Sequence, residues 1–317
     1  MNKKCPLHGL KSKAQLYSML GVNDKKLFRN GIQDKVKIYI AKDPKERLIE
    51  APDYITKKAQ KQVKNYLMKC DFPPYVFSGI KGKSYFNNAE MHLSSKYMYK
   101  TDISKFFPNI SRDKVYLFFL NDLNTSPDVA NILTNICTIN ISDSIETNPQ
   151  VAEFVSKNKI RMFNHLCTGS PASPLLSYLV NRKMFDELNN IAENNGMSFS
   201  VYIDDVFFGS KKPIPYGVRQ QILKTLTKHG YNISFKKVIY YKDKENKKVT
   251  GVIISPNNKL EIPNKLKLKI VSGFSKGNLK DSRAKINGML IASSIIDKNS
   301  FNGIREYMKQ LEKDSEE

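Results

Sequence analysis

Residues 199–210, FSVYIDDVFFGS, constrain the fold of this chain more than any other segment. Two short apolar runs rich in β-forming residues flank Asp204 and Asp205, which predicts a β-hairpin with the acids at its tip. Adjacent carboxylates in apolar surroundings are costly, because burial and like charge both raise their pKa. A protein keeps such a pair where a cation binds. The alternative at this position is an ordinary polar β-turn, in which Asp-Asp pairs are common.

A third acid, Asp102, lies in another apolar segment, residues 97–107, which is expected to form a strand that runs into a turn. If this strand lies beside the hairpin, the three acids converge. Hard oxygen ligands favour Mg²⁺, with Mn²⁺ as the second choice. Two such ions, roughly 3.5–4 Å apart, would hold the attacking and leaving oxygens of a phosphoryl transfer. Asp204 is expected to be a direct ligand, and Asp205 a ligand or a supporting group. The predicted metal site comprises Asp102, Ile103, Asp204 and Asp205.

The charge balance indicates a polyanionic partner. Lys and Arg number 52 against 30 Asp and Glu, a formal net charge of +22, and so large an excess repels itself unless a polyanion neutralises it. Nucleic acid is the first candidate and a membrane surface the second. The chain has no run of about 18 apolar residues, and its start, MNKKCPLHGLKSK, lacks the apolar core of a signal peptide. We therefore expect a cytoplasmic protein with no membrane partner. The cysteines and histidines are too scattered to indicate disulfides or a zinc site.

Local patterns over the 317 residues predict an α+β fold with several packed subdomains. Residues 139–165 are polar and are expected to form an irregular insertion. Besides the hairpin, strands are expected after a turn at 42–47 and over 231–241 and 248–255, with a loop over 79–90 that enters a helix and a turn at Asn257-Asn258. Helices are expected over 53–70 with Asp53 as cap, 112–137 with a break near Pro127, 174–195, 216–229, and from 263 onward with interruptions at Gly273, Gly277 and Gly288.

Three motifs in this chain resemble those of reverse transcriptases and occur in the same order. Asp102 with Phe106-Phe107-Pro108 resembles the first catalytic motif, and Tyr202-Ile203-Asp204-Asp205 resembles the YxDD box. Between them, residues 168–174 (TGSPASP) resemble the QGxPxSP motif that lines the template and dNTP site, although Thr168 replaces the usual Gln. The resemblance covers residues 42–255 and implies an RNA-directed DNA polymerase.

The resemblance also implies the α+β fold of a right-hand polymerase, with fingers, an antiparallel-sheet palm and a helical thumb. It assigns residues 1–95 to the fingers, 96–111 to the first catalytic strand of the palm, 112–165 to helices and the insertion, 166–258 to the palm with its hairpin, and 259–317 to the thumb. Basic residues of the thumb are expected to contact an RNA or hybrid backbone, with a scattered solvated surface as the alternative. These are Lys265, Lys267, Lys269, Lys276 and Lys280.

Two further motifs resemble those of retron reverse transcriptases. Residues 88–92 (NAEMH) fit the NAxxH motif, and residues 249–251 (VTG) fit the triplet linked to recognition of the cognate noncoding RNA. The resemblance implies that part of that RNA is copied into single-stranded DNA from a guanosine 2′-hydroxyl, which leaves a branched RNA–DNA product. It also implies a role in anti-phage defence with a separate effector protein. The expected RNA-binding residues are Asn88, His92, Val249, Thr250 and Gly251; Asn88 could instead cap a helix, and His92 could be structural.

Several residues are expected to bind the incoming dNTP. Phe107, five positions after Asp102, corresponds to the bulky residue that disfavours a ribose 2′-hydroxyl; the alternative is an ordinary core Phe. Lys237, rather than Lys236, would face the triphosphate and give a proton to pyrophosphate, or would be an edge-strand charge. The predicted dNTP site comprises Lys45, Arg47, Phe107, Gly169 and Lys237, and the alternative for Lys45 and Arg47 is a solvated surface pair.

Two other functions remain open at this point. Another prokaryotic reverse transcriptase, of the intron or defence-associated kind, would lack the paired NAxxH and VTG motifs. A catalytically inactive RNA-binding scaffold would have no reason to keep all three acids.

Overall fold

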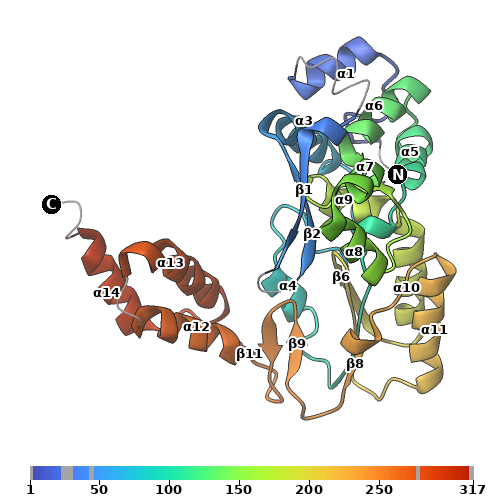
Figure 1. Ribbon diagram of the computed structural model, residues 1–317. Coiled ribbons are helices and arrows are strands. Elements are labelled where there is room, and N and C mark those ends of the chain that lie inside the picture. Colours follow the sequence, from blue (N-terminus) through green and yellow to red (C-terminus); the bar gives the residue numbers. More distant parts are fainter. Residues whose placement is uncertain (1–2, 23–30, 43–45, 276–278, 314–317) are drawn as a thin grey trace.

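The computed structural model describes residues 3–22, 31–42, 46–275 and 279–313. Its centre is an antiparallel sheet whose described strands are ordered β6-β7-β3-β8 (Figure 1). These strands are β3 (Tyr97–Asp102), β6 (Ser198–Tyr202), β7 (Asp205–Ser210) and β8 (Ile239–Tyr241). The hairpin predicted over 199–210 is confirmed as β6 and β7. The strand predicted over 97–107 ends earlier, at Asp102, and a 3₁₀ turn at Phe107–Asn109 follows it.

The two faces of the central sheet pack against different elements. Tyr99, Phe199 and Phe208 belong to the main core, which also contains buried residues of α10 (Arg182–Asn194) and α11 (Tyr216–Lys228). On the other face, Met98 and Phe207 pack with Ala89 of α4 (Tyr85–Glu90) and with Val249, Val252 and Ile254 of a small hairpin. Because successive side chains of a strand alternate between faces, Lys100 and Asp102 share the second face with Met98. The structure also confirms the helix predicted over 216–229, which is α11.

The N-terminal part is built from the β1–β2 hairpin and three helices that pack together. β1 (Val36–Ala41) pairs antiparallel with β2 (Arg47–Pro52). α3 (Tyr54–Leu67) begins where Asp53 accepts a hydrogen bond from the Thr56 N–H at 2.7 Å, so the predicted cap is confirmed. α3 buries Ala59, Val63 and Leu67 against α1 (Lys13–Leu20) and α6 (Pro127–Cys137). The predicted break near Pro127 is confirmed, because α5 (Arg112–Leu117) and a π-helical turn (Phe118–Asp122) precede α6.

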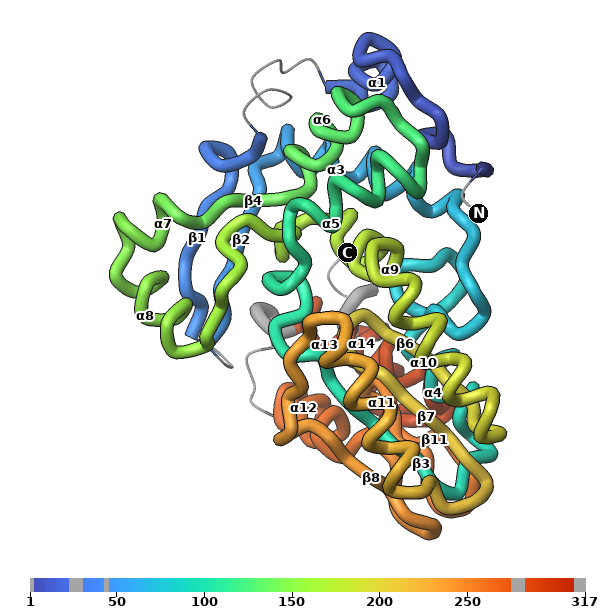
Figure 2. Tube along the Cα trace, turned by 90° about the vertical axis from the view of Figure 1, so that its right-hand side faces the viewer, coloured from blue at the N-terminus to red at the C-terminus, as the bar shows by residue number. Residues whose placement is uncertain are grey.

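The prediction of an irregular insertion over 139–165 is wrong. Residues 138–140 (β4) pair with residues 164–166 (β5), and α7 (Ser142–Thr147) and α8 (Pro149–Lys157) lie between them. α8 forms because the Asn148 side chain accepts hydrogen bonds from the N–H groups of Gln150 and Val151 at 3.1 and 3.4 Å. Its buried side chains are Val151, Phe154 and Val155, and α8 packs beside β1 (Figure 2).

The single helix predicted over 174–195 is also wrong. The chain forms α9 (Ser173–Leu179) and α10, with a break at Asn181. The Asn181 amide donates to the Ser177 carbonyl at 2.9 Å, and its oxygen accepts from the Tyr231 hydroxyl at 2.6 Å. A buried side chain that binds the backbone and a distant tyrosine favours the break over a continuous helix.

Two strand predictions near the C-terminal side of the sheet are corrected. Of the predicted strand 231–241 only 239–241 joins the sheet as a strand, because Phe235–Lys237 form a 3₁₀ turn, and Ile233 forms an isolated bridge with Ile103. The segment 248–255 folds back on itself as β9 (Lys247–Val249) and β10 (Val252–Ile254), with Thr250 and Gly251 at positive φ of 44° and 93°. The turn predicted at Asn257-Asn258 is confirmed, and it joins β10 to β11 (Leu260–Glu261).

The C-terminal helices are set to one side of the molecule, beyond β9 and β11 (Figure 1). They are α12 (Asn264–Ser275), α13 (Leu279–Ile296) and α14 (Asn302–Lys313), and they share a small core of Ile270, Ile286, Leu290 and Met308. The predicted interruptions at Gly273 and Gly288 are wrong, because both residues lie inside helices, and Gly277 lies outside the described residues. In the part of the chain that the structure describes, no helix combines the length and apolar character needed to cross a membrane.

Candidate active site

The β6–β7 turn and the end of β3 bring the three predicted acids to one end of the central sheet. Asp102 is the cross-strand partner of Asp205, and the Ile103 N–H donates to the Asp204 carbonyl at 3.0 Å. Ile203, the first residue of the turn, has a positive φ of 59°. A β-branched residue in this conformation costs on the order of 1–3 kcal/mol, and such strain is found mainly at functional sites. The register therefore places residues about 100 positions apart in the sequence next to each other.

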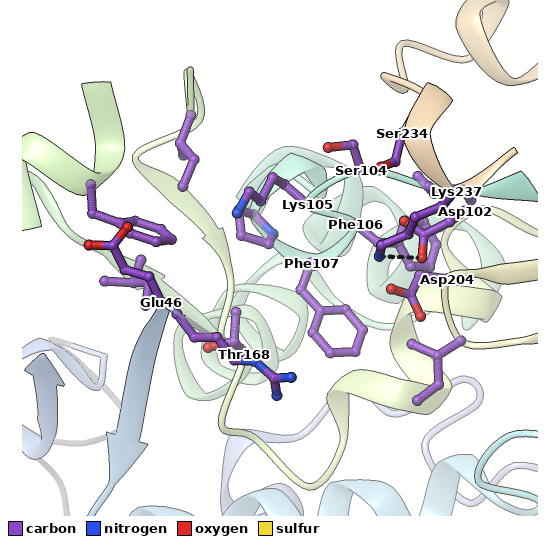
Figure 3. A pocket seen from close by; sticks show the side chains of 17 residues that line it. Glu46, Asp102, Ser104, Lys105, Phe106, Phe107, Thr168, Asp204, Ser234 and Lys237 are labelled. Carbon is purple, nitrogen blue, oxygen red and sulfur yellow. Dashed lines mark hydrogen bonds and ion pairs between the residues drawn. The ribbon is translucent and has the colours of Figure 1, made fainter. Parts of the chain in front are cut away.

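Asp102 and Asp204 line a cavity of about 560 Å³, here called the main pocket. Asp102 is 4% exposed, and its Oδ1 is 2.7 Å from the Lys237 ammonium (Figure 3). Asp205 does not line the main pocket; its carboxylate forms an ion pair with Lys100 at 2.7 Å. No Lys or Arg within the described ranges forms an ion pair with Asp204. Asp204 is therefore the carboxylate of this cluster whose charge is least compensated.

The pKa values of Asp204 and Asp102 are both raised. Burial, followed by the charges of Asp102 and Asp205, raises the pKa of Asp204 to about 6. Burial also raises the pKa of Asp102, although the hydrogen bond from Lys237 opposes the shift. For Lys237, burial lowers the pKa, but the hydrogen bond and charge of Asp102 outweigh it, so the pKa of the ammonium is raised. Additional positive charge at this cluster would lower the pKa of both aspartates.

The donor set fits a hard divalent cation. Asp102 and Asp204 present carboxylate oxygens to the main pocket, Ile103 also lines it, and Asp204 has no ion-pair partner among the described Lys and Arg residues. Among the described residues, no three side chains of the metal-ligating types converge into a complete cage. The ion pair with Lys100 holds Asp205 outside the pocket lining. The assignment of Asp102, Ile103, Asp204 and Asp205 as the metal site thus stays a prediction.

Three of the predicted dNTP-binding residues lie around the main pocket. Arg47, Phe107 and Lys237 all line it, whereas Lys236 does not. Phe107 is half-buried, stacks on Phe106 at 6.2 Å between ring centroids, and projects between Thr168 and Asp204 (Figure 3). Lys45 lies outside the described residues. The pocket thus combines acids, cations and an aromatic ring, a combination suited to a charged ligand with an apolar part.

Gly169 lies where two backbone segments pack closely together. A Cβ atom at this position would lie 1.8 Å from the Glu50 carbonyl oxygen, so only glycine lets the two backbones approach this closely. Gly169 does not line the main pocket, whereas its neighbour Thr168 does, and the contact of Gly169 with a dNTP stays a prediction.

A buried network around Glu50 was not anticipated from the sequence. Glu50 is 1% exposed, and its carboxylate accepts from the Thr168 N–H at 2.6 Å and lies 2.7 Å from His165 Nε2. This network ties β2, which carries Arg47, to the segment that carries Thr168. An acid between apolar residues of a short strand, Ile49 and Ala51, was the available signal for a buried partner.

A sequence model described as reverse transcriptase (RNA-dependent DNA polymerase) matches residues 40–254. The matched region contains the main pocket and the hairpin with Asp204 and Asp205. The chain belongs to the reverse transcriptase family. The resemblance noted in the sequence is therefore confirmed at the level of the family.

Curated relatives of this reverse transcriptase include three retron enzymes. The retron Se72 reverse transcriptase of Salmonella heidelberg is 28% identical over 223 residues, which cover 68% of this chain and 52% of the relative. The retron Ec83 reverse transcriptase of Escherichia coli is 27% identical over 63% of this chain and 62% of its own length. The retron Ec86 reverse transcriptase of Escherichia coli is 24% identical over 86% and 79%. The match thus spans between half and two thirds of the first two relatives.

The two retron-like motifs of this reverse transcriptase form one structural unit. The Thr250 hydroxyl donates to the Tyr85 carbonyl at 2.7 Å and accepts from the Asn88 amide at 3.4 Å. α4 therefore packs on the turn between β9 and β10. Within this unit Val249 is buried, Thr250 is half-buried and Gly251 is exposed. The motifs reach the surface at this turn and at Glu90 and Met91.

Direct RNA contact by Asn88 and His92 is not met in this structure, because both side chains are 0% exposed. His92 lies between two hydroxyls of β6, 3.0 Å from Ser198 and 2.7 Å from Ser200. Burial lowers the pKa of His92 to about 4, so the ring is neutral at neutral pH. The structural alternative for His92 therefore holds. The helix-cap alternative for Asn88 is wrong, because Ser84 caps α4 together with Asn87.

Proposed function

We propose that this chain is an RNA-directed DNA polymerase that copies part of a cognate structured noncoding RNA into single-stranded DNA. The single observation that carries the proposal is the meeting of Asp102, Asp204 and Asp205 at one end of the sheet, beside a pocket that also holds Arg47 and Lys237. Acids and cations around one cavity suit a nucleotide triphosphate together with divalent cations. Membership of the reverse transcriptase family supports the same reaction.

We assign the parts of the molecule to a right-hand polymerase. The β1–β2 hairpin with α1, α3 and α6 would be the fingers, the central sheet with α10 and α11 the palm, and α12, α13 and α14 the thumb. The division at 95/96 inferred from the resemblance needs one adjustment, because Val76 forms a bridge with Val201 and α4 packs on the sheet. We therefore place the boundary between fingers and palm before Tyr75.

In this proposal Asp102 and Asp204 hold two Mg²⁺ ions, or Mn²⁺ in their place, and Asp205 supports them through its charge. The ions would lower the pKa of the primer hydroxyl and stabilise the departing pyrophosphate. Arg47 orients the triphosphate of a dNTP through paired hydrogen bonds. Lys237 is within reach of the same space and can give a proton to the leaving group. Phe107 restricts the space beside the sugar, which favours a deoxynucleotide.

The retron assignment is the finer part of the proposal. The printed names of the relatives and the contact between the NAxxH and VTG motifs support it. We propose that synthesis starts from an RNA 2′-hydroxyl and leaves a branched RNA–DNA product bound to the protein. A separate effector protein and a role in anti-phage defence are part of the same proposal.

A primer-extension assay tests the polymerase activity. Asp204→Ala with Asp205→Ala should abolish DNA synthesis on an RNA template with Mg²⁺, because the pocket loses its uncompensated carboxylate, while RNA binding is largely kept. The matched control is Asp143→Ala with Glu146→Ala, which removes two exposed acids of α7. Equal synthesis by the wild-type protein and the Asp204/Asp205 variant would refute the mechanism. A wild-type protein that binds RNA but synthesises no DNA would favour the alternative function, a catalytically inactive RNA-binding scaffold.

Sequencing the nucleic acid that co-purifies with the chain tests the retron assignment. A branched RNA–DNA species joined through a 2′-oxygen is the expected result. Unbranched DNA, or DNA from unrelated templates, would instead favour a reverse transcriptase of the intron or defence-associated kind.

A further inference from the structure

A second cavity, of about 310 Å³, lies next to the main pocket and is here called the side pocket. Three residues, Ser104, Lys105 and Ile160, line both cavities, so the two share a wall. The other lining residues of the side pocket are Asn109, Asn158, Lys159, Arg161 and Asn232. The segment 158–161 follows α8 and lies within residues 139–165, which were predicted to form an irregular insertion.

The lining of the side pocket is suited to an anion with several oxygens. Lys105, Lys159 and Arg161 contribute positive charge, three asparagines contribute amide groups, and none of the described lining residues is acidic. Lys159 and Arg161 are exposed, so an incoming anion can reach them. Arg in particular presents parallel N–H donors that match the oxygens of a phosphate.

Hydrogen bonds hold the shared wall in place. The Asn109 amide donates to the Ser104 carbonyl at 3.0 Å, and the Ser104 N–H donates to the Asn232 carbonyl at 2.9 Å. Lys105 and Lys159 both have a positive φ, 49° and 51°. Non-glycine residues in this conformation are uncommon and gather where function requires a specific backbone shape. These hydrogen bonds fix the backbone that forms the shared wall.

Lys105 lines both cavities. It is half-buried, its ammonium lies 4.9 Å from the centroid of the Phe154 ring, and it lies between the aspartates and Glu46 in the view of Figure 3. An anion that passed from the main pocket to the side pocket would meet the Lys105 ammonium on its way.

We propose that the side pocket binds inorganic pyrophosphate as it leaves the main pocket, an inference that rests on the proposed function. In that reaction the primer hydroxyl loses its proton to water, its oxygen bonds to the α-phosphorus, and the bond from this phosphorus to the bridging oxygen breaks. The electron pair stays on the oxygen of pyrophosphate, which takes up a proton. The product carries several negative charges and must move away from Asp102 and Asp204. The side pocket offers it cations on the far side of Ser104 and Lys105.

A binding experiment with inorganic pyrophosphate on the full chain, with a chelator and without divalent cations, tests the proposal directly. Lys159→Ala with Arg161→Ala should weaken pyrophosphate binding in titration calorimetry by at least about fivefold, since two charge-assisted contacts are lost. The matched control is Lys224→Ala with Lys228→Ala on α11, which removes the same charge and lines neither pocket. It should bind pyrophosphate like the wild-type chain. If the two variants weakened pyrophosphate binding equally, the loss of binding would come from the change in net charge alone, and the proposal would be overturned.

Product inhibition of primer extension provides the second readout. In the Lys159/Arg161 variant, the inhibition constant for pyrophosphate should rise by at least about threefold more than the KM for dNTP. A parallel rise in the two constants would place these residues in the dNTP site and overturn the proposal. If the wild-type chain synthesises no DNA but only the Lys159/Arg161 variant loses pyrophosphate binding, the polymerase proposal fails and the pyrophosphate site stands.

Discussion

At the scale of residues, lysines lie against carboxylates at the end of the sheet that carries the three acids. Lys237 is paired with Asp102 and Lys100 with Asp205, and Lys100 also lies 5.0 Å from the ring centroid of Phe207. These cations offset part of the repulsion between the acids, and Asp204 is left with a raised pKa. The site therefore retains a partly uncompensated negative charge, which is the property that a divalent cation needs.

Phe107 is expected to decide between ribose and deoxyribose. Phe107→Ala should reduce the preference for dNTP over rNTP by roughly tenfold or more, because the space beside the sugar opens. The measurement is kcat/KM for dGTP and for GTP in primer extension. Phe107→Tyr keeps the ring and serves as the control. An unchanged preference in the alanine variant would assign Phe107 to the core alone.

The lowered pKa of His92 predicts that the free energy of unfolding depends on pH. Its pKa is about 4 in the folded chain and about 6.5 when unfolded, so the unfolded state binds the proton more readily. Its contribution is fully present above about pH 6.5 and is lost as the pH falls towards 4, by up to about 3 kcal/mol.

His92→Gln keeps a hydrogen-bonding group at this position without a titrating ring. Urea unfolding of the wild-type and variant chains at several pH values between 4 and 7 measures the difference. The free energy of unfolding should fall more steeply with acid in the wild-type chain. Parallel curves would mean that His92 is not held neutral in the fold.

At the scale of elements, the chain joins distant segments through a few buried polar contacts. The Glu50 network joins β2 to the segment before α9, and the Thr250 hydroxyl joins the β9–β10 turn to α4. In each contact a side chain bonds to a backbone group of the other segment. These contacts fix the positions of the elements that carry the functional residues.

The link between α4 and the β9–β10 turn can be measured as a coupling energy. Thr250→Val should cost roughly 1 kcal/mol of unfolding free energy, because the Tyr85 carbonyl loses its donor. Combined with Asn88→Ala, the two changes should be non-additive by roughly 0.5–1 kcal/mol. Urea unfolding of both single variants and the double variant gives the value. Additive effects would show that Asn88 and Thr250 do not act as a unit.

At the scale of the whole molecule, the net charge of +22 and the placement of lysines favour a long polyanionic ligand. Lys265, Lys267 and Lys269 of α12 are exposed, whereas Lys276 and the side chain of Lys280 lie outside the described residues. The C-terminal helices have their own small core, centred on Ile270 and Ile286. This part of the chain can therefore present charge to a ligand without a change in the core around the central sheet.

RNA binding by the full chain is expected to depend steeply on salt. With six or more phosphate contacts, the affinity should fall by about 10³-fold or more between 50 and 200 mM salt. Fluorescence anisotropy with a structured RNA at several salt concentrations measures the slope. A change of less than about tenfold would contradict a binding mode based on the phosphate backbone.

The sequence by itself determined the features that depend on residues close together in the chain, namely turns, helix caps and short motifs. The alternation of apolar residues around Asp204 and Asp205 predicted the hairpin, Asp53 predicted the start of α3, and the polymerase motifs predicted the family. In each case the signal is local, because a turn, a cap and a motif are read within a few residues. The breaks at Asn181 and Thr250 were missed because their causes lie in distant contacts, with Tyr231 and Tyr85.

Only the tertiary structure decided which of these residues work together. The pairing of β3 with β7 set Asp102 opposite Asp205, burial placed His92 against β6, and the approach of the segment 158–161 to the turn after β3 formed the side pocket with Lys159 and Arg161. The physical reason is that strand register, burial and cavities arise from packing between segments far apart in the chain. A shift of β3 by one residue would turn Asp102 to the opposite face of the sheet, and no local pattern around Asp102 specifies that register.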